Sequence, residues 1–240
     1  MVGYFHLRRL LSGVIDELLP DAIETSLCTE PGNAWRRDGV EAYCPRCGAS
    51  TGPGAVTGKG CAACLDQRLA WDRLYRLGPY EPPMDGWIRQ AKFHGHWRWT
   101  PWLGRQLAEV VGEPMVAGQV AVCPVPMHWG RRWWRGYNQA RLMADALAAA
   151  RGWPVADVLH RPRGRPPQTA VPPHRRAGNV AGSFAVEPVD LSGWEIVLVD
   201  DVKTTGATLT ACARLLREAG ARSVVVAVAA VAGGGEGVTR

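Results

Sequence analysis

The sequence predicts an α/β protein whose main domain contains a parallel β-sheet with helices on both faces. Three apolar runs, at residues 120–123, 195–201 and 223–231, read as buried strands. Two helical patterns, at residues 138–150 and 207–219, lie between these runs. Strands that are apolar without alternation are typical of parallel sheets covered on both faces.

Length and composition fit one domain of ordinary size and a small accessory module. The 240 residues are 47% hydrophobic and 21% charged, which excludes a disordered chain. No run of 18 apolar residues is present, and the first nine residues lack the pattern of a signal peptide. We therefore expect a cytoplasmic protein without a membrane span, whose seven cysteines are metal ligands or core residues rather than disulfides.

The chain divides into four parts. Residues 1–27 have leucines at helical spacing, which predicts an amphipathic helix packed on the rest of the protein. Residues 28–70 hold paired cysteines among glycines and prolines, and residues 71–118 form an aromatic and basic connecting segment. The larger domain spans residues 119–240.

Two CxxC pairs in the second part predict a zinc ribbon. Thiolates at this spacing can close tetrahedrally on Zn²⁺, and a zinc ion whose four ligands all come from protein is structural. The alternative is four buried or redox-active cysteines. The predicted ligands are Cys44, Cys47, Cys61 and Cys64.

The strongest functional pattern begins at the carboxyl end of the strand predicted at residues 195–201. Asp200 and Asp201 lie where open α/β sheets bind ligands, and they are placed to accept hydrogen bonds from sugar hydroxyls and to orient a hydrated Mg²⁺. The loop that follows opens a helix, whose N–H groups and dipole favour a phosphate. The alternative is a solvated turn. The predicted phosphate-binding residues are Lys203, Thr204, Thr205, Gly206, Ala207 and Thr208.

This run resembles the phosphoribosyl pyrophosphate (PRPP) signature of type I phosphoribosyltransferases, whose fold is Rossmann-like. The resemblance implies that Asp200 and Asp201 form the catalytic pair and hold the ribose hydroxyls, that residues 204–208 hold the 5′-phosphate, and that Mg²⁺ accompanies PRPP. Oxopurine-salvage members carry Asp at the position of Thr204, which argues against a hypoxanthine or guanine enzyme.

A second block resembles the ComF family of phosphoribosyltransferase-like proteins, which is associated with competence and DNA uptake. The family's PVP…RGFNQ pattern is matched by residues 122–126, 131–132 and 135–140, and members also have an N-terminal cysteine ribbon. Gln168, Arg176, Asn179 and Phe184 follow in the family's order. By resemblance to the amidophosphoribosyltransferases, the pyrophosphate would lie against Cys123, Pro124, Val125 and Pro126, with Arg131, Arg132 or Arg135 as counter-charges.

Positive charge is concentrated in residues 131–178. This segment has ten arginines against two aspartates, a balance of +8, whereas the rest of the chain carries −2. Its run of arginine and tryptophan is typical of single-stranded nucleic-acid contacts, and residues 94–102 would extend the surface. The alternative is that the tryptophans fill the contact between the ribbon and the main domain. The candidate nucleic-acid contacts are Arg132, Trp133 and Trp134.

Two functions follow from these patterns. The first is an enzyme in which a nucleophile displaces pyrophosphate from PRPP·Mg²⁺, while a mobile loop at residues 161–178 excludes water. The second is a non-catalytic module of the DNA-uptake machinery that binds single-stranded DNA and keeps the phosphoribosyltransferase fold. The two are compatible, and neither identifies an acceptor or an oligomeric state.

Overall fold

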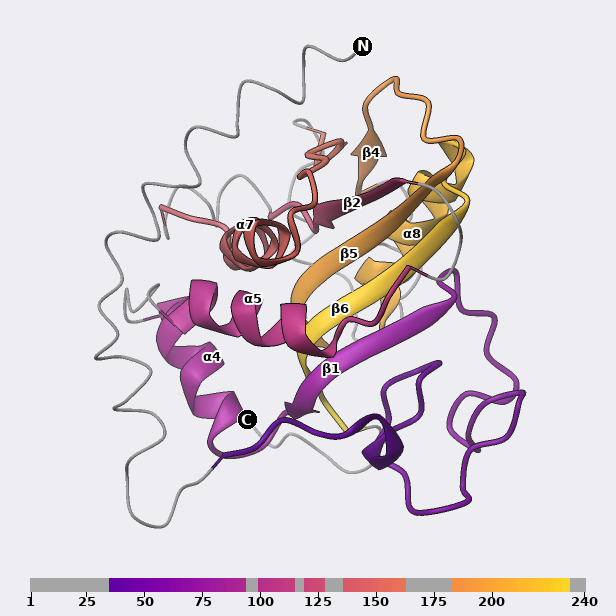
Figure 1. The fold of residues 1–240 in the computed structure, drawn as a ribbon, viewed down its shortest axis with the longest axis vertical. Helices are drawn as coiled ribbons and strands as arrows, with labels where there is room; N and C mark the ends of the chain where they lie inside the picture. Colours follow the sequence, from indigo (N-terminus) through magenta and orange to yellow (C-terminus); the bar gives the residue numbers. More distant parts are fainter. Residues whose placement is uncertain (1–34, 94–98, 115–118, 128–135, 163–182, 234–240) are drawn as a thin grey trace, which may run out of the picture.

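A four-stranded parallel sheet forms the centre of the protein (Figure 1). The computed structural model describes residues 35–93, 99–114, 119–127, 136–162 and 183–233. The strand order is β1-β6-β5-β2, and all three neighbouring pairs are parallel. The strands are β1 (Arg73–Pro79), β2 (Gln119–Pro124), β5 (Trp194–Lys203) and β6 (Ser223–Val231).

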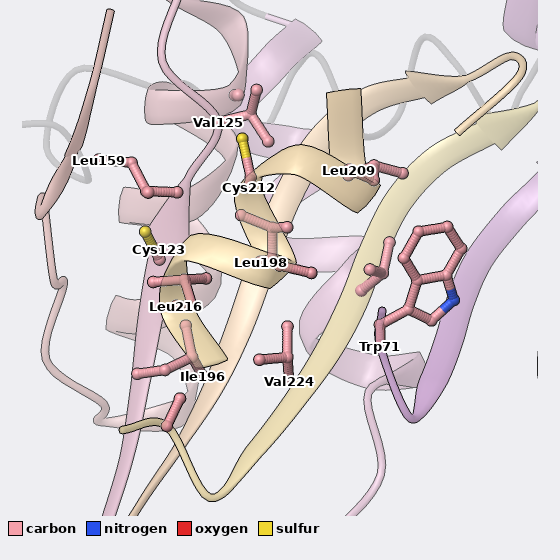
Figure 2. Packing of buried hydrophobic residues seen from close by; sticks show 14 of the residues in the cluster. Trp71, Cys123, Val125, Leu159, Ile196, Leu198, Leu209, Cys212, Leu216 and Val224 are labelled. Carbon is pink, nitrogen blue, oxygen red and sulfur yellow. The ribbon is translucent and has the colours of Figure 1, made fainter. Parts of the chain in front are cut away.

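Helices cover both faces of this sheet. On one face α4 (Met84–Phe93), α5 (Trp99–Val110) and α7 (Gln139–Arg151) pack against β-strand side chains that include Val197 and Val199. The other face holds α8 (Ala207–Glu218) and a two-stranded antiparallel sheet of β3 (Leu159–His160) and β4 (Ala185–Val186). Successive residues of a strand point to opposite faces, so both sides of β5 are buried. Figure 2 shows Cys212 and Leu216 of α8 above Ile196 and Leu198.

Part of the sheet and two of its covering helices come from the segment predicted to connect the ribbon with the larger domain. β1 pairs with β6 from Arg73 to Pro79, and both α4 and α5 pack on the sheet, although all three elements fall in the segment 71–118. β1 is hard to recognise because two arginines interrupt its apolar pattern. One of them, Arg76, is buried, because residues of the cysteine-rich part surround it.

The cysteine-rich part covers the outer edge of β1. The backbone N–H of Leu74 donates to Pro45 O at 2.7 Å, and the N–H of Asp38 donates to Leu77 O at 2.8 Å. Arg76 is only 2% exposed and donates to Gly48 O at 2.7 Å and to the carboxylate of Asp38 at 2.5 Å. A buried charge with such partners avoids most of the cost of leaving water. The ribbon is therefore joined to the sheet by backbone and side-chain bonds.

The predicted strands and helices of the larger domain are confirmed with boundaries that differ by one or two residues. The predicted helix at residues 1–27 lies outside the described residues, as does the predicted loop at residues 161–178 from residue 163 onward. Among the described helices, none has both the length and the apolar composition needed to cross a membrane.

Candidate functional site

Four cysteine sulfurs form one buried cluster in the ribbon. Cys44, Cys47, Cys61 and Cys64 place their sulfur atoms within 4.8 Å of one another. The Sγ–Sγ distances are 3.8 Å for Cys44–Cys64, 3.6 Å for Cys47–Cys61 and 3.9 Å for Cys61–Cys64. Four sulfurs bound tetrahedrally to Zn²⁺ at about 2.3 Å would be about 3.8 Å apart. The cluster therefore has the dimensions of a structural zinc site.

The surroundings of Cys44 favour its thiolate, whereas burial raises the pKa of Cys47 and of Cys64. Burial raises the pKa of Cys44, but hydrogen bonds from the backbone N–H groups of Cys47 and Arg46 outweigh burial and lower that pKa to about 7. Backbone donors of this kind stabilise the deprotonated sulfur that a metal requires. The alternative of redox-active cysteines has less support, because all four sulfurs gather at one point.

The two adjacent acids lie at the carboxyl end of β5, as the sequence predicts. The N–H of Asp201 donates to Asp200 Oδ1 at 2.9 Å, and Lys92 Nζ lies 2.9 Å from Asp201 Oδ2. Burial, followed by the charge of Asp201, raises the pKa of Asp200 to about 7. The two carboxyl groups thus form a partly buried site that accepts hydrogen bonds. A positive charge nearby favours the ionised form of Asp200.

The predicted phosphate loop turns directly into α8. Gly206 has φ +81° and is the N-cap of this 12-residue helix, so the N-cap residue has no side chain to cap the first turn. The N–H of Ala207 donates to Thr205 Oγ1 at 3.4 Å. Thr204 and Thr205 are exposed, and Thr208 is the second residue of the helix, in its first turn. A helix N-terminus with hydroxyl groups around it is a favourable site for a phosphate.

Trp71, which directly follows the ribbon, packs on the phosphate loop. A side chain added at Gly206 would lie 3.2 Å from Trp71 Cη2 and 3.4 Å from Lys203 Cε. Trp71 is fixed in turn, because its Nε1 donates to Arg46 O between the first two cysteines at 2.9 Å. Burial lowers the pKa of Lys203. A residue that the ribbon binds, Trp71, therefore packs beside the glycine of the phosphate loop.

The second predicted loop, residues 123–126, lies beside the acids. β2 pairs with β5 as far as Pro124 and Val199, and the N–H of Val125 then donates to Val199 O at 2.9 Å. The end of β2 therefore lies next to the residue that precedes Asp200. Burial raises the pKa of Cys123 to about 12, so this thiol stays protonated and is a packing residue.

Two basic residues near the acids were not predicted. Lys92 approaches Asp201 from α4, and Arg161 donates to Pro126 O at 3.1 Å while its guanidinium lies 4.2 Å from the centre of the Phe184 ring. Both positive charges oppose the rise in the pKa of Asp200 that burial and Asp201 cause. One signal was available for Lys92, because the chain has 25 arginines and only three lysines, two of which lie at this site.

The arginine–tryptophan run at residues 131–135 lies outside the described residues, so its predicted contacts stay predictions. The structure places four other tryptophans in one cluster. Trp35 and Trp87 approach at 5.4 Å between ring centres, Trp87 and Trp99 at 5.9 Å, and Trp102 is 3% exposed. Trp102 thus packs against Trp35 of the cysteine-rich part, and Trp99 stacks on Trp87 of α4, which favours the packing interpretation for these two.

Comparison with known proteins agrees with this arrangement. A family model described as the phosphoribosyl transferase domain matches residues 136–239. Competence protein F of Haemophilus influenzae is 31% identical over 195 residues, which cover 77% of this chain and 82% of that protein. This chain belongs to the ComF family. DNA utilization protein YhgH of Escherichia coli K12 is 31% identical to our ComF-family protein over 206 residues, or 83% of this chain and 88% of the relative.

The family match places the site within a known domain. The matched residues include the acidic pair and the phosphate loop, but they begin after the loop at residues 123–126. The ComF-family protein is therefore an α/β phosphoribosyltransferase-like protein with a cysteine ribbon packed on its sheet. Among solved structures, a glutamine PRPP amidotransferase from B. subtilis aligns at 25% identity over 54% of this chain and 25% of that chain, with a TM-score of 0.38.

Proposed function

We propose that this ComF-family protein binds PRPP together with Mg²⁺ at the carboxyl edge of β5 and β2. One observation carries the proposal. The acidic pair at the end of β5 leads within six residues to the N-terminus of α8, and the end of β2 lies beside it. A sugar that carries a phosphate at each end needs two anion sites with hydrogen-bond acceptors between them, and this edge offers that order.

Each part of the ligand has a group of residues to hold it. Asp200 and Asp201 accept hydrogen bonds from the ribose hydroxyls. The first-turn N–H groups of α8 and the hydroxyls of Thr204, Thr205 and Thr208 surround the 5′-phosphate. Residues 124–126 are proposed to lie against the pyrophosphate, with Arg131 and Arg135 as counter-charges, while Cys123 stays buried in the core. When bound with PRPP, Mg²⁺ neutralises part of the charge of the pyrophosphate.

Displacement of pyrophosphate is the reaction that such a site supports. A nucleophile would form a bond to the anomeric carbon of the ribose as the bond to the pyrophosphate breaks, and the pyrophosphate would leave with the bonding electron pair. The protein would contribute alignment and stabilisation of the leaving charge. We include this activity in the proposal without an assigned acceptor, and binding of PRPP is the part tested first.

Calorimetric titration of PRPP and Mg²⁺ into zinc-loaded protein tests the site. We expect saturable binding that ribose 5-phosphate competes with, and loss of at least tenfold in affinity for Asp201→Asn. Asp66→Asn is the matched control, because Asp66 is an exposed carboxylate of the ribbon. Equal affinities for the wild type and Asp201→Asn would refute the assignment, as would the absence of binding by the wild type.

The cysteine cluster is proposed to hold one structural Zn²⁺. Its sulfur–sulfur distances support this assignment. Metal analysis of the purified protein should find one zinc per chain and a large loss of zinc on Cys44→Ser. A reduced tetrathiolate site also supports a cytoplasmic location, which remains part of the proposal.

A role in DNA uptake is proposed from the relatives. One is named a competence protein and others are named DNA utilization proteins. The local charge of +8 in residues 131–178 supports contact with single-stranded DNA. Replacing Trp133 and Trp134 by alanine should weaken binding of a single-stranded oligonucleotide and leave PRPP affinity unchanged. Binding that ignores both the double substitution and the salt concentration would exclude this surface.

A further inference from the structure

Lys92 reaches the acidic pair from α4, an element that no predicted motif includes. It lies in the last turn of α4, and its Nζ is 2.9 Å from Asp201 Oδ2. The side chains of Lys92 and Asp201 are 22% and 16% exposed, so solvent reaches this ion pair only in part. Such a pair lies in a lower dielectric than a surface salt bridge, and its orientation is correspondingly better defined.

The end of α4 is fixed by two side chains from the start of α7. The hydroxyl of Tyr137 donates to the carbonyl oxygen of Ala91, and Gln139 Nε2 donates to the same oxygen at 3.4 Å. The last carbonyl groups of a helix have no partner within the helix. Here, two donors bind the carbonyl immediately before Lys92, which sets the position from which the lysine side chain extends.

The same three-residue segment also holds the loop proposed for pyrophosphate. Asn138 Nδ2 donates to Val125 O at 3.0 Å, and Asn138 lies between Tyr137 and Gln139. Residues 137–139 therefore connect the loop at residues 123–126 on one side with the end of α4 on the other. Through this connection the loop at residues 123–126 is joined to the end of α4, from which Lys92 reaches Asp201.

We propose that Lys92 is a PRPP-binding residue of the pyrophosphate subsite. In the free protein its ammonium group neutralises Asp201, and on binding it exchanges this carboxylate for the pyrophosphate oxygens, which leaves Asp201 to accept from the ribose. A lysine suits this exchange because its ammonium is a point charge on a flexible stem. The inference rests on the proposed PRPP site and adds a ligand from a separate part of the chain.

The test compares two ligands that differ in the pyrophosphate. PRPP with Mg²⁺ and ribose 5-phosphate are titrated separately into the wild type, Lys92→Met and Lys92→Arg. Loss of one charge-assisted contact should reduce PRPP affinity of Lys92→Met by about 10- to 100-fold. Affinity for ribose 5-phosphate should stay within about threefold, because that ligand has no pyrophosphate, and Lys92→Arg should keep most of the PRPP affinity.

Arg89→Met is the matched control. It removes a positive charge three residues earlier on α4, from a side chain that is 60% exposed and pairs with Asp85. Thermal unfolding checks that each variant is folded. Unchanged PRPP affinity in Lys92→Met would refute the inference, and so would an equal loss for both ligands, since the lysine would then act only through Asp201. Failure of the wild type to bind PRPP would instead refute the proposed function.

Discussion

Replacing Asp200 by asparagine should stabilise the ligand-free protein at alkaline pH while it removes PRPP binding. The pKa of this carboxyl is raised by burial, and next by the charge of Asp201, from its ordinary 3.8 to about 7. A group whose pKa is higher in the folded state contributes stability that is complete below about pH 4 and lost as the pH rises through about 7. Asparagine keeps the shape of the side chain and carries no proton that dissociates in this pH range.

The size of this effect follows from the two pKa values. They differ by about three pH units, each equivalent to about 1.4 kcal/mol, which gives an upper limit of about 4 kcal/mol. Because solvent still reaches the carboxyl in part, we expect roughly half of this, or about 2 kcal/mol. Part of this change occurs below pH 5, so the advantage of Asp200→Asn over the wild type should grow by about 1 kcal/mol between pH 5 and pH 8.

Urea unfolding at pH 5, 6.5 and 8 without ligand measures this difference. Asp190→Asn is a control of the opposite kind, because hydrogen bonds from Ser192 lower the pKa of Asp190. Asp190 is ionised in both states throughout this range, so its replacement should shift stability equally at each pH. A difference between Asp200→Asn and the wild type that stays constant from pH 5 to 8 would refute the electrostatic argument.

The other predictions concern binding and the ribbon. PRPP affinity of the wild type should rise from pH 6 to pH 8 in calorimetry, because only ionised Asp200 accepts two hydrogen bonds; a flat profile would contradict this. Arg76→Met should cost about 3 kcal/mol in urea unfolding, because it leaves the Asp38 carboxylate without its partner, and Asp38→Asn in the same chain should recover part of the loss. Gly206→Ala should weaken PRPP binding at least tenfold, whereas Gly193→Ala, at the same φ of +81° but in open space, should bind normally. Chelation of zinc should lower both the unfolding temperature and the PRPP affinity, and an unchanged affinity would separate the ribbon from the site.

The elements that the sequence predicts well are those whose stability is local or apolar. β5 and β6 are continuous apolar runs, and the acids and the glycine that follow β5 carry a specific pattern of spacing. β1 was not predicted, because it is stable as a strand only when the ribbon supplies partners for Arg76. A charged residue in a strand is normally predicted to be exposed. Arg76 is buried because its partner Asp38, 38 residues away in the sequence, neutralises it.

The basic residues of the site were missed for a related reason. Lys92 and Arg161 lie about 109 and 40 positions from the acids in sequence, and folding alone brings them together. Nothing in the residues around either one marks it as part of a phosphate site. A sequence motif reveals ligand-binding residues that are consecutive in the chain. Counter-charges can instead come from any element that reaches the same edge of the sheet.

The packing of the ribbon explains why it is better regarded as part of the ligand site than as a separate module. It pairs with the edge strand of the sheet, and it binds Trp71, which contacts Gly206 at the start of α8. Loosening the cysteine cluster would release Trp71 from Arg46, and the loop would lose the indole that lies beside Gly206. Zinc and the phosphoryl ligand would then be thermodynamically linked, so that each should increase the affinity of the protein for the other.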